Sequence, residues 1–465
     1  MVETRLKIRK DITLSEQLAG IIMDEIKTAR PGYKVLPERK LAGKYSVSRK
    51  TVRSAIKIIS EKGFLDRKVG KGSFVSEKIK NNAEIPSILL NFTEDMPYDT
   101  IEKMVRNINK DKEILKVRHF YGNYSYVNSF LKLIENASGT GEKFDLICVD
   151  EGIIHYLAKK NLIVPLDELT EKSKVIKKEM FHHEVRRAFE YNGRLYGIPQ
   201  FYSTIVIFYN KKLFDKYGID YPDDGWNWND LLETALSLTV KSTGTGKNLI
   251  YGFGFSPMHF NTIMPFIYQG VPKEQKLDEN ILRNGKIIEG LNFLYDLIYK
   301  YKVSPPLYNE TIISHEKMFK TGMLAMFTGF YSSYCHLNAE PFSGWGMVRL
   351  PCGKREAVSV PVQGWAVSSE SSVRKSFRAI EKIFASSNTA ALTDELKRIP
   401  SCKIPQYKIP EIFIESLDNA VPSMKVFSDM ELRKTFMEEL LFLFNNCKTA
   451  ENVVEKIKSC FDRKN

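Results

Sequence analysis

Residues 31–75 read PGYKVLPERKLAGKYSVSRKTVRSAIKIISEKGFLDRKVGKGSFV, and this stretch decides the fold of the N-terminal part of the chain. Its apolar residues recur at helical spacing, which predicts a short helix over 38–45 and a second helix that begins at Arg49. Ser48 precedes that second helix. A serine hydroxyl at this position accepts a hydrogen bond from a free N–H of the first turn, so we expect Ser48 to be the N-cap.

The second predicted helix has two distinct faces. Its apolar residues lie four and then three positions apart, on one buried stripe: Val52, Ile56 and Ile59. Its cations lie four positions apart on another face: Arg49, Arg53 and Lys57. A helix of this kind suits the major groove of DNA.

Residues 64–67 and 73–76 are predicted to pair as a small hairpin after the second helix. Lys68 and Lys71 make its tip basic. A basic hairpin beside such a helix is the wing of an α+β winged helix-turn-helix. The alternative, that these cations form an ordinary solvated helix face, is disfavoured because the cap, the apolar stripe, the turn and the wing all agree.

These residues resemble the DNA-binding domain of the GntR family of bacterial regulators. The family pattern runs in three pieces: Glu38-Arg39-Lys40-Leu41-Ala42, Val47-Ser48-Arg49-Lys50-Thr51-Val52-Arg53 and Gly70-Lys71-Gly72-Ser73-Phe74-Val75. Pro37 departs from it, because the family usually has a helix-capping serine there. The resemblance implies a homodimer that reads double-stranded operator DNA. It also implies the contact residues: Arg39, Arg49 and Arg53 for bases or phosphates, Ser48 and Thr51 for placing the helix, and Lys71 and Gly72 for the wing tip.

Composition separates this part from the rest of the chain. The protein has 465 residues, 43% of them hydrophobic, which is enough for two or three domains. Its net charge is +13, yet residues 1–80 alone carry 20 Lys and Arg against 9 Asp and Glu. The basic excess therefore belongs to the predicted DNA-binding part. The remainder is nearly neutral, so its ligand need not be an anion.

The sequence leads us to expect that this is neither a secreted nor a membrane-spanning protein, and that it has no metal or catalytic site. Residues 1–25 contain no long apolar core, so we expect no signal peptide and a cytoplasmic location. No apolar run approaches the roughly 18 residues of a membrane span. The six cysteines are scattered, and the adjacent His182 and His183 would point apart. We therefore predict no metal site, no cofactor and no catalytic residues.

Beyond residue 85 the chain alternates between predicted strands and helices, which indicates α/β layers. Residues 87–92 form a short apolar strand, and 144–150 read as a buried parallel strand that ends on Asp150. The predicted division is a winged domain over 1–76, a linker over 77–84 and an α/β module over 85–465.

The module resembles sugar-binding extracellular solute-binding proteins, the family of the maltose-binding protein. The resemblance rests on ordered landmarks: residues 144–147, 193–199, 208–211, 226–232, 322–327 and 364–368. It implies a periplasmic-binding-protein-like fold of type II, with two α/β lobes and a ligand cleft. Chain crossings are expected near Pro199–Phe208 and Trp345–Pro351. The first lobe would hold 85–198 and 352–395, the second 205–345, and the last helices would pack back across both.

Sugars are held by polar groups at their hydroxyls and by aromatic rings against their C–H faces. The resemblance places such groups at strand ends and hinge loops: Asn91, Tyr121, Asp150, Glu151, Tyr202, His259, Phe330, Tyr331 and Trp365. The competing interpretation of each aromatic residue is core packing, and Trp228 is assigned to the core outright.

Three readings of the whole chain follow. The leading one is a regulator whose cleft senses a small solute, with a carbohydrate as the expected effector. In the second, the module is an aminotransferase-like enzyme domain that holds pyridoxal phosphate through a lysine, as in some GntR-type regulators of similar length. In the third, the module makes only protein contacts and its cleft is filled.

Overall fold

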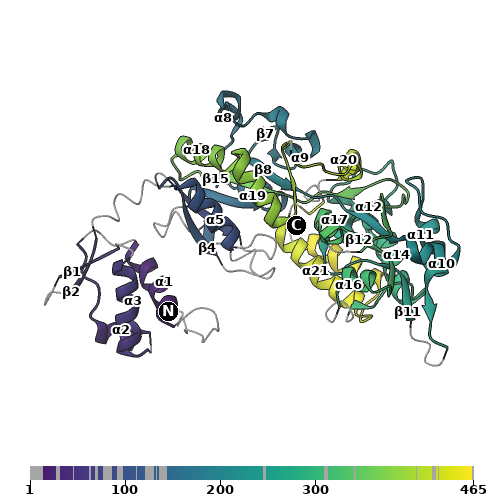
Figure 1. Cartoon of the computed structure of the whole chain (residues 1–465), viewed down its shortest axis with the longest axis horizontal. Helices are drawn as coiled ribbons and strands as arrows, with labels where there is room; N and C mark the ends of the chain where they lie inside the picture. The colour runs from purple at the N-terminus through teal and green to yellow at the C-terminus, as the bar shows by residue number, and fades with distance from the viewer. Residues whose placement is uncertain are drawn as a thin grey trace.

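The computed structural model describes residues 14–27, 32–45, 47–61, 64–68, 72–76, 86–91, 98–110, 113–120, 130–131, 133–135, 144–243, 248–307, 313–339, 342–404, 406–421, 426–427 and 429–462. Figure 1 labels the elements that these residues form. Lys71, Tyr121 and the predicted linker 77–84 lie outside the described residues, and so does the side chain of Asn91.

The N-terminal domain is a winged helix-turn-helix, as predicted. Its elements are α1 (Leu14–Lys27), α2 (Glu38–Lys44), α3 (Arg49–Glu61), β1 (Leu65–Lys68) and β2 (Gly72–Val75). The predicted stripe of α3 is buried, and it packs with Leu18 and Ile22 of α1 in one apolar core. Burying such side chains contributes about 1.5–3 kcal/mol each, so this core fixes the position of α3 and leaves its cationic face outside.

The wing is an antiparallel hairpin in which Leu65 pairs with Val75 and Lys68 with Gly72. The segment before α2 adds to it, because the Gly32 N–H donates to the Val75 carbonyl at 2.8 Å and Lys34 bridges to Phe74. Gly32 has φ +82 and Gly72 has φ +110, in the left-handed region that favours glycine. The backbone conformation therefore favours glycine at both positions.

The first lobe is built on a six-stranded sheet in the order β16-β8-β15-β5-β3-β4. Its strands are β3 (Ser87–Asn91), β4 (Lys116–Phe120), β5 (Leu146–Asp150), β8 (Gly197–Tyr202), β15 (Val362–Val367) and β16 (Ile399–Pro400). The strand β5 is buried and parallel to β3, as predicted. The helices are α5 (Tyr98–Ile108), α7 (Glu151–Lys159), α8 (Asp167–Lys172), α9 (His183–Arg187), α18 (Val373–Ile383) and α19 (Ser386–Leu396).

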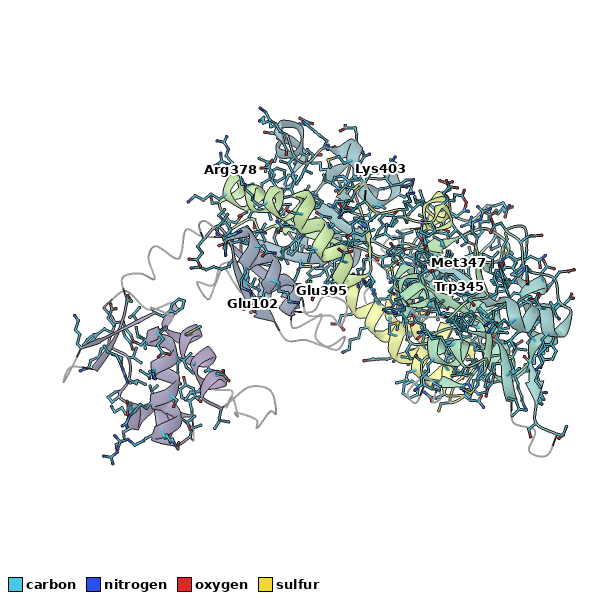
Figure 2. All side chains as sticks on the ribbon, in the orientation of Figure 1. Glu102, Trp345, Met347, Arg378, Glu395 and Lys403 are labelled. Carbon is cyan, nitrogen blue, oxygen red and sulfur yellow. The ribbon has the colours of Figure 1, made fainter. Side chains whose placement is uncertain are left out.

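Helices α5 and α19, distant in sequence, are joined on this lobe. The carboxylate of Glu395 accepts hydrogen bonds from Thr100 Oγ1 at 2.7 Å and from Lys103 Nζ at 3.2 Å. Figure 2 labels Glu395 beside Glu102 of α5. The contact ties the segment after the second crossing to the beginning of the lobe.

The second lobe has a five-stranded sheet in the order β10-β11-β12-β9-β13. Its strands are β9 (Val206–Asn210), β10 (Val240–Lys241), β11 (Asn248–Gly254), β12 (Leu324–Gly329) and β13 (Trp345–Val348). Its helices are α10 (Lys211–Tyr217), α11 (Trp228–Leu238), α12 (Phe260–Gln269), α13 (Asn280–Arg283), α14 (Ile288–Tyr299), α16 (His315–Lys320), α17 (Tyr331–Ala339), α21 (Met430–Phe444) and α22 (Ala450–Asp462). Trp228 stacks on Phe293 at 4.2 Å, which confirms its structural assignment.

Among the described residues, the chain passes between the two lobes three times. The first passage joins β8 to β9 through 203–205, and the second leaves β13 after Val348 and reaches β15 at Val362. Both lie where the sequence predicts them. The third follows β16 and contains α20 (Glu411–Glu415), η3 (Ser416–Asn419) and β17 (Ala420–Val421). There β17 pairs in parallel with β14 (Val358–Ser359), so the second and third passages are joined.

Two boundaries differ from the prediction. The first lobe extends beyond residue 395, because β16 pairs with β8 in its sheet. The last helices do not share their core between the lobes: α21 and α22 bury Phe436, Leu440 and Ile457 in the apolar cluster of the second lobe. The remaining short elements are η2 (Lys178–Met180) and the hairpin of β6 (Glu190–Tyr191) with β7 (Arg194–Leu195).

Candidate DNA interface and inter-lobe ligand site

Helix α3 begins with a formed N-cap. The Ser48 hydroxyl oxygen accepts from the Thr51 N–H at 3.1 Å, and the two hydroxyl groups lie 2.8 Å apart. The cap therefore agrees with the prediction. Both hydroxyls are fixed at the positive end of the helix dipole, which favours a nearby anion such as a DNA phosphate.

The cations of this domain differ in their partners. Arg39 and Arg49 are exposed, and no hydrogen bond or ion pair joins either to another of the described residues. Arg53 instead contacts the Glu38 carboxylate, through Nη2 at 3.1 Å and Nε at 3.3 Å. Arg67 of β1 lies 3.8 Å from the same carboxylate. The carboxylate of Glu38 is thus the common partner of two arginines, Arg53 and Arg67.

Pro37 changes the start of α2. It supplies no side-chain cap, and only its carbonyl accepts, from the N–H groups of Lys40 at 2.8 Å and Leu41 at 3.0 Å. The departure from the family pattern therefore costs this helix its hydroxyl cap.

The wing keeps its cations over an aromatic ring. Lys68 Nζ lies 5.2 Å from the centroid of the Phe74 ring, and Lys34 Nζ lies 5.9 Å from it. Such contacts hold a lysine without neutralising it. Gly72 is exposed at the start of β2, while Lys71 beside it is outside the described residues.

Four of the predicted ligand residues lie at one end of the first-lobe sheet. Asn91 ends β3, Asp150 ends β5 and Tyr202 ends β8, while Glu151 follows directly as the first residue of α7. Register explains the grouping, because Gln363 of β15 pairs with Asp150 on one side and Phe201 on the other. Asp150 also has a structural role: its Oδ1 accepts from Gly152 N and Ile153 N, each at 2.8 Å, and so caps α7.

Glu151 has the most perturbed carboxylate of this group. Its side chain is buried, and its Oε2 accepts from the Val362 N–H at 3.1 Å. Burial, and after it the negative charge of the neighbouring Asp150, raises the pKa of Glu151 to about 7, while the positive charge of Arg433 opposes the rise. Burial also raises the pKa of the Tyr202 hydroxyl to about 12, so that this tyrosine remains neutral.

The second lobe contributes three predicted residues at the ends of two parallel strands. Phe330 and Tyr331 follow β12, and His259 comes after its parallel neighbour β11. The rings of His259 and Phe330 lie 5.2 Å apart. Tyr331 is buried, with its ring 5.7 Å from Phe413 in an edge-to-face contact.

Two cations that the sequence did not suggest lie in the same region. Arg433 of α21 covers the ring of Phe260 at 4.4 Å, and its charge acts on Glu151 of the other lobe. Arg398 donates from Nη1 to Gln363 Oε1 at 2.8 Å, at the end of the first-lobe sheet. Neither belongs to a motif, and Arg433 reaches Glu151 only through the fold, so no sequence signal could have found them.

Trp365 is placed differently from the other predicted residues. It lies inside β15, opposite Cys148 and Ile198, and it is fully buried. Its indole N–H already donates to Gln200 Oε1 at 3.1 Å. The structure thus gives Trp365 a place in the first-lobe core, which is the competing interpretation for an aromatic residue.

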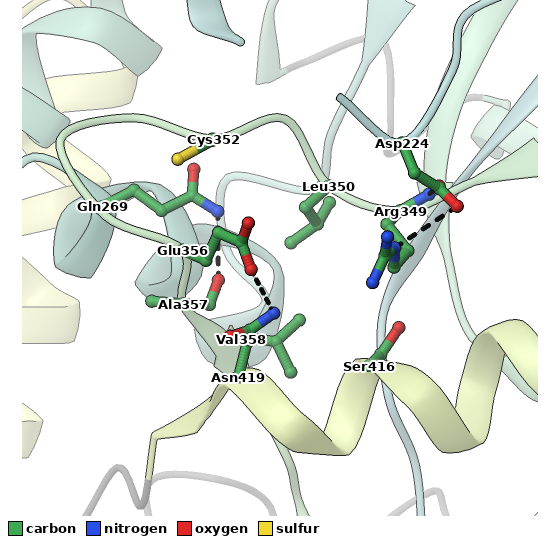
Figure 3. Close-up of a pocket in the computed structure, with 10 residues that line it drawn as sticks. All are labelled: Asp224, Gln269, Arg349, Leu350, Cys352, Glu356, Ala357, Val358, Ser416 and Asn419. Atoms are coloured by element: carbon green, nitrogen blue, oxygen red, sulfur yellow. Dashed lines mark hydrogen bonds and ion pairs between the residues drawn. The ribbon is translucent and has the colours of Figure 1, made fainter. Parts of the chain in front are cut away.

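A small pocket, open to solvent, lies where the second and third passages meet. Arg349 contacts Asp224 at 3.4 Å, Asn419 donates to Glu356, and Gln269 donates to the Ala357 carbonyl at 3.0 Å (Figure 3). None of the predicted ligand residues is among the described residues that line it. It is a feature of the hinge, separate from the grouped strand ends.

Two further properties concern the described residues alone. Within these ranges no three or more His, Cys, Asp or Glu side chains are arranged to hold a metal ion. No helix formed by the described residues is both long and apolar enough to cross a membrane.

Comparison with known families agrees with this architecture. Residues 106–372 match the profile of the family described as bacterial extracellular solute-binding protein, which is more than half of the chain. The chain belongs to this family. Residues 14–75 match the bacterial regulatory proteins of the gntR family, so the chain carries a GntR domain at its N-terminal end.

Individual relatives match each of the two parts of the chain. An arabinooligosaccharide-binding protein of Halalkalibacterium halodurans is 30% identical over 118 residues, which are 24% of each chain. The uncharacterised HTH-type transcriptional regulator YurK of Bacillus subtilis is 49% identical over 67 residues, 14% of this chain and 28% of that protein. This chain therefore covers about a quarter of the length of either relative.

The two-lobed fold is also found among solved structures. The ABC substrate-binding protein Lmo0181 from Listeria monocytogenes, in complex with cycloalternan, has a TM-score of 0.65 to this chain at 20% identity. The likeness covers 82% of this chain and 98% of that one. At this identity it establishes the fold of the solute-binding module and no more.

Proposed function

We propose that this protein is a one-component transcription regulator that binds operator DNA through α3 and the wing and senses a sugar or oligosaccharide between its two lobes. The observation that carries the proposal is the joining, in one chain, of a GntR domain and a solute-binding module. A DNA reader needs access to the chromosome, so the proposal places the protein in the cytoplasm. No enzymatic step is part of it.

The DNA side rests on the geometry of α3. Arg49 is exposed and uncommitted among the described residues, and the capped N-terminus of α3 holds Ser48 and Thr51 where a phosphate would approach. Arg39, Arg53, Gly72 and Lys71 complete the proposed contacts. We propose a homodimer, because the domains of this family read paired half-sites.

The ligand side combines polar and aromatic groups from both lobes. Asp150, Glu151 and Tyr202, with Asn91 and Tyr121, would meet sugar hydroxyls from the first lobe. His259, Phe330 and Tyr331 would meet them from the second. Carbohydrate chemistry is supported by relatives whose names record an arabinooligosaccharide and cycloalternan. A ligand that contacts both lobes favours their closed arrangement, and this couples sugar binding to DNA binding.

Thermal unfolding of the full chain tests the ligand half. A panel of mono- and oligosaccharides, arabino-oligosaccharides among them, is expected to contain one that raises the melting temperature in a concentration-dependent way. Gel shifts with duplexes enriched from a randomised pool test the DNA half, and the same sugar should change the affinity. If no sugar of the panel raised the melting temperature, the sensing proposal would be contradicted. If no DNA sequence were enriched, operator binding would be contradicted.

A module that makes only protein contacts is the second candidate. It is favoured by the burial of Glu151, Tyr202 and Tyr331, because these side chains leave little free surface at the proposed site. The Phe330→Ala variant discriminates between the two candidates. A sensing site loses its ligand-dependent stabilisation in this variant, whereas a filled module gives no such stabilisation even in the unaltered protein.

A further inference from the structure

Glu38 is the point at which the three elements of the candidate DNA interface meet. It lies in the first turn of α2, yet it contacts Arg53 of α3 at 3.1 Å and Arg67 of β1 at 3.8 Å. Its side chain is 27% exposed, against 64% for Arg53. A single carboxylate therefore connects the helix before the turn, the helix after it and the wing.

The contact with Arg53 constrains orientation. Both Nε and Nη2 of Arg53 face the carboxylate, at 3.3 and 3.1 Å from Oε2. A guanidinium group is planar and its N–H groups form a rigid fork, so fixing two nitrogens fixes the plane of the whole group. The Arg53 side chain as a whole stays exposed. Arg49, one turn earlier on α3, has no such partner among the described residues.

We propose that Glu38 is a positioning residue that determines the sequence specificity of DNA binding, an inference that rests on the proposed DNA-binding function. It holds Arg53 in one orientation and offsets part of its positive charge. Arg53 then contributes most to the affinity when a base edge or phosphate matches the fixed orientation of its N–H groups, and it contributes little to the affinity for DNA of any other sequence.

The physical basis is the difference between the two modes of binding. Non-specific affinity follows the number of uncompensated cations, since each one releases counterions from the phosphates. Specific affinity follows the geometry of a few side chains at base edges. A paired arginine contributes less to the first mode and, when its plane is fixed, more to the second.

Three variants of the full chain separate charge from positioning. Glu38→Gln removes the charge and weakens the hold on Arg53. Glu38→Asp keeps the charge but withdraws the carboxylate by one methylene. Glu61→Gln is the matched control, because Glu61 also pairs with a cation of α3, Lys57 at 3.7 Å, without contacting Arg53. Melting temperatures check that all three fold.

The probes are a duplex enriched from a randomised pool by the unaltered protein and a scrambled duplex of the same composition. We expect Glu38→Gln to bind the scrambled duplex about three- to tenfold more tightly, with a salt dependence steeper by about one counterion. The ratio of the two affinities should fall at least about fivefold. In Glu38→Asp only the affinity for the enriched duplex should fall, whereas Glu61→Gln should preserve the ratio.

Two results would overturn the inference. One is an unchanged ratio of the affinities for the enriched and scrambled duplexes in Glu38→Gln. The other is an equal fall of this ratio in Glu61→Gln, because the effect would then come from the change in net charge alone. Arg49→Ala distinguishes this from failure of the proposed function. If that variant binds the enriched duplex as tightly as the unaltered protein, DNA recognition through α3 is wrong. If it loses binding while the Glu38 variants keep the ratio, only the role of Glu38 is wrong.

Discussion

The winged domain and the two-lobed module differ in how far apart along the chain their working residues lie. The candidate DNA contacts of the first fall within 34 positions, from Arg39 to Gly72. In the second, Glu151 and Arg433 act on each other from different lobes across most of the module. Helix caps, periodicity and turns are local properties, so a contiguous motif reveals the first kind of site. The second kind exists only after the chain has crossed between the lobes.

The largest expected effect tests whether Trp365 belongs to the core. Trp365→Ala should lower the free energy of unfolding of the lobes by about 3–5 kcal/mol, because a fully buried indole leaves a cavity. Chemical denaturation followed by circular dichroism measures the loss. Phe330→Ala is the comparison. Because Phe330 is only half-buried, this variant should lose less stability than Trp365→Ala but more of the stabilisation by ligand. If Trp365→Ala kept its stability but was no longer stabilised by the ligand, Trp365 would be a ligand-binding residue after all.

The next effect is a pH dependence that belongs to the inter-lobe site. Burial raises the pKa of Glu151 to about 7, so the folded protein retains a proton that the unfolded chain, with a pKa near 4.5, has lost. The stabilisation is complete below pH 4.5 and is lost as the pH rises towards 7, by at most about 3 kcal/mol. Thermal unfolding across this range measures it. Glu151→Gln should remove this component, whereas the exposed control Glu168→Gln should keep it.

A smaller effect concerns the DNA interface. Arg49→Ala should weaken binding to an enriched duplex by about 1–3 kcal/mol, because it removes an exposed guanidinium at the capped end of α3. Fluorescence anisotropy at fixed salt measures the change. Lys50→Ala removes the same charge from the next position of the helix and should cost clearly less. Equal losses would mean that α3 contributes charge and no direct recognition.

The smallest effect tests local structure alone. Ser48→Ala should destabilise the start of α3 by about 1 kcal/mol, since the Thr51 N–H loses its acceptor. Amide hydrogen exchange in α3 of the full chain reports it, with the lobes unaffected. Ser48→Asp supplies another acceptor and should restore protection. If protection in Ser48→Ala equals that of the unaltered protein, the cap does not stabilise the helix.

Local chemistry made much of the fold predictable. Val52, Ile56 and Ile59 are buried as their spacing requires, and Asp150 ends a buried parallel strand. Prediction was less accurate where distant segments pair. The strand β16 joins the first lobe only because its backbone meets β8, and α21 and α22 belong to the second lobe only because their apolar faces complete its core.

The sequence by itself determined the capped, cationic helix, the wing and the order of strands and helices, because each depends on residues within one or two turns of one another. Only the tertiary structure decided that Trp365 is a core residue, that the charge of Arg433 acts on Glu151 and that Glu38 holds Arg53. Burial and ion pairing depend on which surfaces meet after folding, and spacing along the chain does not encode that directly.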